Sequence, residues 1–146
     1  FQLLAQVVGR VGRNHHATTI VVQSYQPQHP AVQLGIKQDY ETFYDETIDL
    51  RQRSKFPPFT HLMKLTCIYK TEAVAIRHCK VLAEKLKAKY PTVTLFGPVP
   101  AFYERQHDTY RWQIVVKSHR RGVLLDLLGD VPPTHWQADI DPMSLL

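Results

Sequence analysis

The sequence predicts an α+β protein, in which a mainly helical N-terminal part is followed by a part that mixes strands and helices. Apolar residues in positions 1–60 recur mostly at helical spacing. Beyond them, short segments that alternate apolar with polar residues are separated by helical segments. The proline-rich segment 55–59 lies between the two parts and ends the preceding helix, because proline cannot continue a helix.

The N-terminal part is expected to consist of helices and one strand. Residues 1–13 lack proline and carry apolar residues at helical spacing, which predicts a helix. The β-branched run at 18–25 predicts a strand. A short helix over 31–38 and a longer one over 40–54 follow, and Asp39 is a good N-cap for the longer helix.

The C-terminal part shows the order strand, helix, strand, strand, helix, strand. The predicted strands are 61–70, 92–104, 110–117 and 136–140, and the predicted helices are 72–90 and 119–129. Gly97-Pro98-Val99-Pro100 interrupts the second strand and predicts a bulge or bend. The βαββαβ order is typical of a ferredoxin-like fold, in which two helices cover one face of the sheet and the other face is available for binding.

The core of the C-terminal part is expected to include one apolar stripe of each helix, and the first strand presents two opposed faces. The strand alternates between two faces, one with Met63, Leu65, Cys67 and Tyr69 and the other with Leu62, Lys64, Thr66 and Ile68. Thr71 is expected to cap the long helix. The expected apolar stripes consist of Ile76, Cys79, Ala83, Leu86 and Tyr90 on the long helix, and of Val123, Leu124, Leu127 and Leu128 on the second.

Composition narrows the class of protein. The 146 residues are 44% hydrophobic, which is typical of a globular chain. The formal net charge is +5, divided as +1 over residues 1–60 and +4 over residues 61–146. A basic C-terminal part is compatible with nucleic acid or an acidic peptide as partner, and also with solubility alone. No apolar run reaches the roughly 18 residues of a membrane helix, and no signal peptide is visible.

The cysteines and histidines give little sign of a metal. Cys67 and Cys79 are twelve positions apart and are interpreted as small buried hydrophobes rather than as a disulfide or a metal pair. The His15-His16 pair has no cluster of cysteines or carboxylates around it. We therefore expect no metal site in this chain.

A motif near the start of the chain points to ATP chemistry. Gln6, Gly9, Arg10, Gly12 and Arg13 match the pattern Q-x-x-G-R-x-G-R. The pattern resembles motif VI of superfamily 2 helicases and translocases. That resemblance implies that Arg10 and Arg13 are catalytic arginines for the γ-phosphate of ATP, a role that suits the forked, permanently charged guanidinium. It also implies that Gln6, Gly9 and Gly12 contribute to the nucleotide site.

The chain contains no P-loop of the form G-x-x-x-x-G-K-[ST]. The two arginines therefore have no ATP site of their own, and we expect the isolated fragment to be inactive. The first residue is Phe rather than Met. Together these features predict the C-terminal piece of a larger motor, in which residues 1–25 end a RecA-like helicase lobe, residues 26–60 form a helical linker and residues 61–146 form the C-terminal domain.

Further segments make the resemblance more specific. In order they read KFPPF at 55–59, LFGPVPA at 95–101, YRWQI at 110–114 and DIDP at 139–142. This series resembles the C-terminal end of the primosomal protein N′ (PriA) family of replication-restart DNA helicases. The resemblance covers the whole chain. One departure is that Val8 and Val11 stand where the family usually has Ala.

The resemblance implies a parent that is an ATP-dependent 3′-to-5′ DNA helicase, which restarts replication at stalled forks by reloading the primosome. ATP and Mg²⁺ would act in that parent, and zinc would lie in a domain absent from this fragment. The implied partners are DNA forks and single strands, the acidic C-terminal tail of single-stranded-DNA-binding protein and other primosome proteins. No membrane partner is implied. The implied location is the cytoplasm, in association with the nucleoid.

A basic cluster in the C-terminal part is the second candidate site. Lys117 ends a predicted strand, and Arg120 and Arg121 open the next helix, where free backbone N–H groups also favour an anion. We expect these three residues to bind DNA or the acidic tail; a solvated surface cluster is the alternative.

For the chain as a whole, the alternatives are a stand-alone nucleic-acid or protein-tail binding module and another superfamily 2 helicase.

Overall fold

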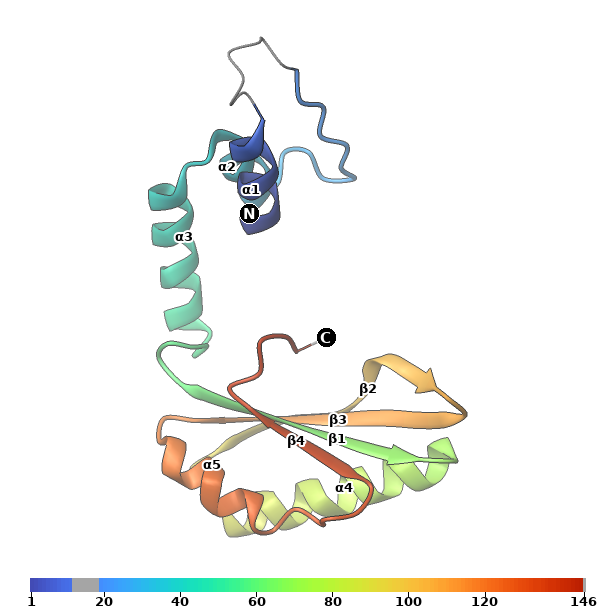
Figure 1. Ribbon diagram of the computed structural model, residues 1–146. Coiled ribbons are helices and arrows are strands. Elements are labelled where there is room, and N and C mark those ends of the chain that lie inside the picture. Colours follow the sequence, from blue (N-terminus) through green and yellow to red (C-terminus); the bar gives the residue numbers. More distant parts are fainter. Residues whose placement is uncertain (12–18, 146) are drawn as a thin grey trace. The chain divides into compact units, whose positions relative to one another are not determined.

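The structure, a computed structural model, describes residues 1–11 and 19–145 (Figure 1). It divides into two compact units, Phe1–Ser54 and Lys55–Leu146. The regular elements described in the first unit are helices, and the second unit combines an antiparallel sheet with two helices. The predicted α+β class is confirmed.

The first unit contains three helices, α1 (Gln2–Arg10), α2 (Pro30–Lys37) and α3 (Tyr40–Arg53). Helix α1 packs on α2 where Gly35 faces Leu4, since a Cβ at Gly35 would lie 3.1 Å from the Leu4 Cβ. The Phe1 ring stacks on Phe43 of α3 with centroids 4.3 Å apart. The Asp39 carboxylate accepts a hydrogen bond from the backbone N–H of Thr42 at 3.1 Å, so the predicted N-cap is confirmed.

Two predictions in this unit are wrong in extent or type. The described part of α1 ends at Arg10, and Val11 already has extended backbone angles. Residues 19–25 do not form the predicted strand. A β-branched run becomes a strand only beside another strand that pairs its N–H and C=O groups, and no strand is described within 1–11 and 19–54. The side chains of Val21 and Tyr25 are accordingly exposed.

The second unit is a four-stranded sheet in the order β2-β3-β1-β4, and each pair of neighbouring strands is antiparallel. Helices α4 and α5 both cover the same face of this sheet (Figure 1). Along the chain the elements are β1 (His61–Tyr69), α4 (Glu72–Lys89), β2 (Thr94–Gln106), β3 (Thr109–Ser118), α5 (Arg121–Leu128) and β4 (Trp136–Ile140).

The core lies between the sheet and its two helices. Met63, Leu65 and Cys67 of β1 are fully buried, so the structure assigns this face of the strand to the core. The register pairs Leu65 with Ile114 of β3, which is buried in the same cluster. Cys67 and Cys79 are free and buried, in agreement with their interpretation as core residues. Because the helices cover one face only, the other face of the sheet can carry polar side chains, such as Lys64 and Thr66, beside apolar ones such as Leu62 and Val115.

The buried stripe of α4 is displaced from its predicted position. The buried residues of this helix are Ala75, Cys79, Leu82 and Leu86, whereas Ile76 and Ala83 are half-buried at the edge of the stripe. Both sets have helical spacing, so periodicity alone did not distinguish them. Thr71 is the N-cap without a side-chain hydrogen bond, and Leu128 of α5 is exposed rather than buried.

The predicted irregularity in β2 is confirmed. Its register against β3 shifts between Phe96 and Val99, and again between Pro100 and Arg105. Gly97 has a φ of +97°, and a Cβ there would lie 2.7 Å from the backbone O of Gln113. Only glycine fits this close approach in that conformation. The second shift was not predicted, and it contains the exposed aromatic residues described below.

Candidate functional site

The motif VI residues that the structure describes lie on α1. Arg10 is exposed in the last turn of the helix, and Gln6 is exposed one turn earlier, so the two side chains share a helix face. Gln6 also lines a shallow pocket whose wall includes Tyr40 and Phe43. A Cβ at Gly9 would lie 3.6 Å from Nε2 of Gln38, at ordinary contact distance. Gly12 and Arg13 lie outside the described residues.

The predicted basic cluster is only partly available for a ligand. The Lys117 side chain is nearly buried, at 9% exposure, and its Nζ lies 3.5 Å from the ring centroid of Phe56 and 4.7 Å from that of Phe96. Burial lowers the pKa of Lys117, while the two ring faces favour the charged ammonium. Lys117 therefore acts as a packing residue between two rings, a role that the prediction of an anion site at this position did not foresee.

Arg121 is engaged by a carboxylate of its own chain. Its Nε donates a hydrogen bond to Oδ2 of Asp141 at 3.0 Å, and His61 Nδ1 lies 3.6 Å from Oδ1 of the same residue. The Arg121 hydrogen bond holds the pKa of Asp141 below its ordinary value. The Arg120 side chain is exposed, and its backbone N–H is satisfied by the Ser118 hydroxyl at 3.1 Å. This corner of the domain thus shows that it can hold a carboxylate.

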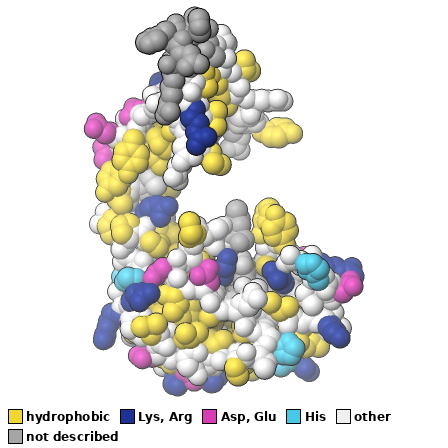
Figure 2. Space-filling view, viewed as in Figure 1, with side chains coloured by type: hydrophobic (Ala, Val, Ile, Leu, Met, Phe, Trp, Pro, Cys, Tyr) yellow, Lys and Arg dark blue, Asp and Glu magenta, His cyan; other side chains and the backbone are white. Residues whose placement is uncertain are grey.

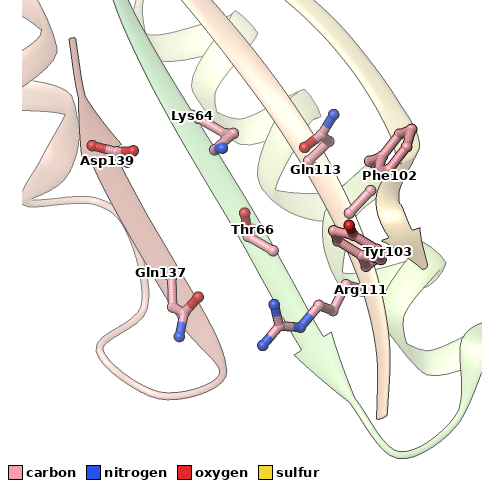
Figure 3. Close-up of a pocket in the computed structure, with 9 residues that line it drawn as sticks. Lys64, Thr66, Phe102, Tyr103, Arg111, Gln113, Gln137 and Asp139 are labelled. Carbon is pink, nitrogen blue, oxygen red and sulfur yellow. The ribbon is translucent and has the colours of Figure 1, made fainter. Parts of the chain in front are cut away.

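A second concentration of functional groups lies on the uncovered face of the sheet, and the sequence prediction did not assign it. A pocket of about 230 Å³ opens there between side chains from all four strands (Figure 3). We call it the open-face pocket. It is lined by Lys64, Thr66, Ala101, Phe102, Tyr103, Arg111, Gln113, Gln137 and Asp139.

The pleat of the sheet explains why these residues meet. Alternate residues of a strand point to the same face, so the burial of Met63 and Leu65 turns Lys64 and Thr66 to the open side. The register places Thr66 beside Gln113 on β3 and beside Gln137 on β4. The alternation in the first predicted strand already places Lys64 and Thr66 on one face. The pattern of a single strand does not show which strands are its neighbours, so it could not bring Gln113 and Gln137 beside Thr66.

The edge strand β2 supplies the aromatic wall of the open-face pocket. Phe102 and Tyr103 lie in the second register shift of β2 and are 64% and 70% exposed. Their rings meet edge to face, with centroids 5.0 Å apart. In Figure 3 the Tyr103 ring lies next to Arg111, whose side chain extends from β3 across β1. The pocket therefore combines two cations and one carboxylate with amides, a hydroxyl and aromatic rings.

Comparison with known proteins identifies the family. Residues 52–143 match the family described as the primosomal protein N C-terminal domain. The chain belongs to this family. It is 34% identical over its full length to the replication restart protein PriA of Bacillus subtilis, and 33% identical over 99% of its length to that of Synechocystis. The resemblance to the PriA family that the motifs predicted is thus confirmed.

The match covers a small part of each relative. The chain spans 18% of the Bacillus subtilis and Synechocystis proteins and 20% of the Chlamydia pneumoniae one, to which it is 32% identical. None of the described helices is long and apolar enough to span a membrane. Within residues 1–11 and 19–145, no three His, Cys, Asp or Glu side chains gather in a way that could hold a metal ion.

Proposed function

We propose that this chain is the C-terminal region of a replication-restart DNA helicase, which supplies the end of the second motor lobe and a DNA-binding domain. The observation that carries the proposal is that proteins named replication restart protein PriA align with 99 to 100% of the chain. The segment with Gln6 to Arg13 and the sheet domain are therefore both covered by the match to single proteins of that name. The parent is proposed to be an ATP-dependent 3′-to-5′ helicase that reloads the primosome, in the cytoplasm and in association with the nucleoid.

The domain assignment follows from the same proposal. Residues 1–25 end a RecA-like lobe, residues 26–60 form a helical linker and residues 61–146 form a ferredoxin-like domain. The strand order β2-β3-β1-β4, with both helices on one face, supports the last assignment. ATP and Mg²⁺ act at the motor, and zinc is held by a domain outside this chain.

Arg10 and Arg13 are proposed to act as arginine fingers on an ATP that the first motor lobe holds. A guanidinium placed at the γ-phosphate stabilises the charge of the phosphoryl transition state. The exposed position of Arg10 on the same helix face as Gln6 supports this role. Gly9 and Gly12 complete the proposed nucleotide contact, and the single chain has no turnover because it lacks a P-loop.

The C-terminal domain is proposed to bind DNA and the acidic tail of single-stranded-DNA-binding protein. The net charge of +4 over residues 61–146 favours polyanions. On the face shown in Figure 2, Lys and Arg side chains are spread around this unit and alternate with acidic and apolar ones. We propose Arg120 and Arg121 as the tail contact, since Arg121 already binds a carboxylate.

Two alternatives remain distinct from this proposal: a stand-alone binding module, and another superfamily 2 helicase. The family match favours the proposal over another superfamily 2 helicase. Kinetics of the full-length parent separate it from a stand-alone binding module. Arg10→Ala or Arg13→Ala should lower DNA-stimulated ATP hydrolysis by roughly 10³-fold, the scale of an arginine finger, with little change in DNA affinity. Arg53→Ala, at an exposed arginine in the last turn of α3, is the matched control and should leave turnover unchanged. Normal ATPase in both motif variants would refute the catalytic role.

A further inference from the structure

The open-face pocket contains a buried donor that lacks a partner. The Nε of Arg111 is buried and makes no hydrogen bond within the described residues. A buried N–H without an acceptor costs free energy, so native structures leave few of them. Trp112 Nε1 is also buried without a hydrogen bond in the described residues. Trp112 packs against the core on the other side of the sheet, so it does not belong to the pocket. The unpaired donor at Arg111 therefore points to an acceptor that a ligand brings to the open face.

Two neighbouring side chains of the pocket already donate hydrogen bonds to oxygen atoms above the sheet. Lys64 Nζ donates to the backbone carbonyl of Ser144 at 2.8 Å, and Gln113 Nε2 donates to that of Leu145 at 3.3 Å. Both acceptors belong to the segment that follows β4 and returns over the sheet. These two contacts show that Lys64 and Gln113 can each hold an oxygen acceptor above the sheet, as an oxygen-rich ligand would require.

The aromatic wall gives the pocket a second recognition element. Tyr103 and Phe102 are large apolar side chains that remain mostly exposed beside the two cations. Exposed rings next to cations are typical of single-strand binding surfaces, where bases stack and phosphates pair with Lys and Arg. Phe102 contacts the Tyr103 ring edge to face, and Tyr103 stays 70% exposed, so part of its ring is accessible to a stacked base.

The charges of the pocket favour a nucleotide over an acidic peptide. Lys64 and Arg111 together outweigh Asp139, so the pocket attracts an anion. An acidic side chain would satisfy the cations but would neither stack on Tyr103 nor donate to the Asp139 carboxylate. A nucleotide does all three, because it carries phosphate oxygens, a planar ring and at least one N–H donor on the base, which in thymine is the ring N3–H.

We propose that the open-face pocket binds one nucleotide of single-stranded DNA, with the base stacked on Tyr103 and oxygen atoms of the nucleotide on Arg111 and Lys64. This inference rests on the proposed DNA-binding function of the domain and assigns that function a surface and a strand type. The pocket volume of about 230 Å³ suits one planar group at a time. Neighbouring nucleotides would follow the uncovered sheet.

Fluorescence anisotropy of the 146-residue chain with a labelled oligothymidylate of about 15 nucleotides tests the proposal. Tyr103→Ala should weaken binding by about 5- to 100-fold, the range for loss of one stacked base, whereas Tyr103→Phe should bind within about 2-fold of the original chain because it keeps the ring. Arg111→Gln should weaken binding by about 10-fold, as expected for a charge-assisted hydrogen bond. Lys80→Gln removes the same charge from the exposed side of α4 and should have a much smaller effect.

An abasic strand of equal length separates stacking from charge. Against that strand Tyr103→Ala should have no effect, while Arg111→Gln should still weaken binding. Circular dichroism verifies that each variant is folded, and the largely exposed Tyr103 keeps the test decisive if Arg111→Gln does not fold. Unchanged oligothymidylate binding in Tyr103→Ala would overturn the proposal. A glutamate-rich peptide that loses affinity in Arg111→Gln while the oligothymidylate does not would assign the pocket to a protein. Neither result would alter the ATPase outcome for Arg10 and Arg13.

Discussion

Arg121 is half-exposed and already pairs with a carboxylate, which makes it the best defined anion contact of the predicted basic cluster. The Arg121 Nε lies 3.0 Å from Oδ2 of Asp141, and the side chains are 53% and 42% exposed. An ion pair with this exposure is weak and can be exchanged for a better one. An incoming carboxylate from a protein tail would therefore compete with Asp141 for the same guanidinium.

This competition gives a two-sided prediction for the tail of single-stranded-DNA-binding protein. Replacing Arg120 and Arg121 together by Ala should weaken tail binding by about 1–3 kcal/mol, the range for charge-assisted hydrogen bonds. Asp141→Asn should instead tighten it by about 2- to 5-fold, because a weak ion pair no longer has to be broken. Asparagine also tolerates the φ of +53° at this position. Calorimetry with a synthetic tail peptide measures both effects.

The two variants control for each other, since each removes charge from the same corner with opposite expected results. Equal tail affinity in the double arginine variant and the original chain would place the tail site elsewhere. DNA binding, which is spread over many basic groups, should fall less than tail binding and keep a steep dependence on salt.

The environment of Lys117 could not be predicted from its neighbours in the sequence. The sequence places it three positions before Arg120, and this proximity suggested one cluster. The pleat instead turns Lys117 to the open face of the sheet, where its ammonium lies between the rings of Phe56 and Phe96. Both rings come from distant segments, so no local pattern could have predicted this environment.

At the scale of elements, sequence patterns were most informative where residue types and spacing within one segment carry the signal. The alternation of β1, the cap at Asp39 and the bulge at Gly97 all depend on local spacing, and the structure confirms them. The predicted strand at 18–25 failed because strand formation depends on a neighbour that local spacing does not provide. The open-face pocket escaped prediction for the same reason, since it requires the order of the strands.

The turn after α5 is joined to the end of α4 by one carboxylate. Asp130 accepts hydrogen bonds from Lys89 Nζ at 2.6 Å and from the Tyr90 hydroxyl at 2.7 Å, and Lys85 Nζ lies 3.3 Å from its other oxygen. The Lys89 hydrogen bond, with that of Tyr90, holds the pKa of Asp130 well below its ordinary value. Asp130 thereby links the two helices that cover the core.

The depressed pKa makes this link depend on pH. A carboxylate whose folded-state pKa is lowered stabilises the fold above its unfolded pKa of about 3.9, and that contribution is lost as pH falls through the folded value. Asp130→Asn should therefore lower the urea midpoint clearly at pH 7, and the difference from the original chain should shrink as pH falls from about 5 towards 2. Asp126→Asn, at an exposed residue of α5, is the control and should change little. A difference for Asp130→Asn that does not vary with pH would contradict the assigned role.

At the scale of the whole molecule, the two units differ in the core that each contains. The second unit buries a continuous cluster between four strands and two helices. In the first unit Gly35 is the buried residue among the three described helices, and several large side chains, including Leu3, Tyr40 and Leu50, remain exposed. A helical segment without a buried apolar face has little tertiary stabilisation, so the second unit should fold independently and the first should not.

The position of the boundary can be tested together with this expectation. Lys55 and Phe56 belong to the second unit by contact, since the Thr60 hydroxyl donates to the backbone carbonyl of Lys55 at 2.8 Å and the Phe56 ring covers Lys117. A fragment of residues 55–146 should therefore melt cooperatively. A fragment of residues 61–146 should also fold, but it leaves Lys117 without one ring and should lose about 1–2 kcal/mol, the size of a desolvated cation–π contact.

Circular dichroism melts and urea titrations of the fragments 1–54, 55–146 and 61–146 decide these points. Phe56→Ala in the fragment 55–146 is the matched variant, because it removes the ring and keeps the chain length. It should reproduce most of the loss seen in 61–146, since the ring contact rather than the extra length supplies the stability. A broad, non-cooperative melt of 55–146 would contradict the independence of the sheet domain. Equal stability of 55–146 and 61–146 would instead place the boundary at the prolines 57 and 58, where the sequence alone had put it.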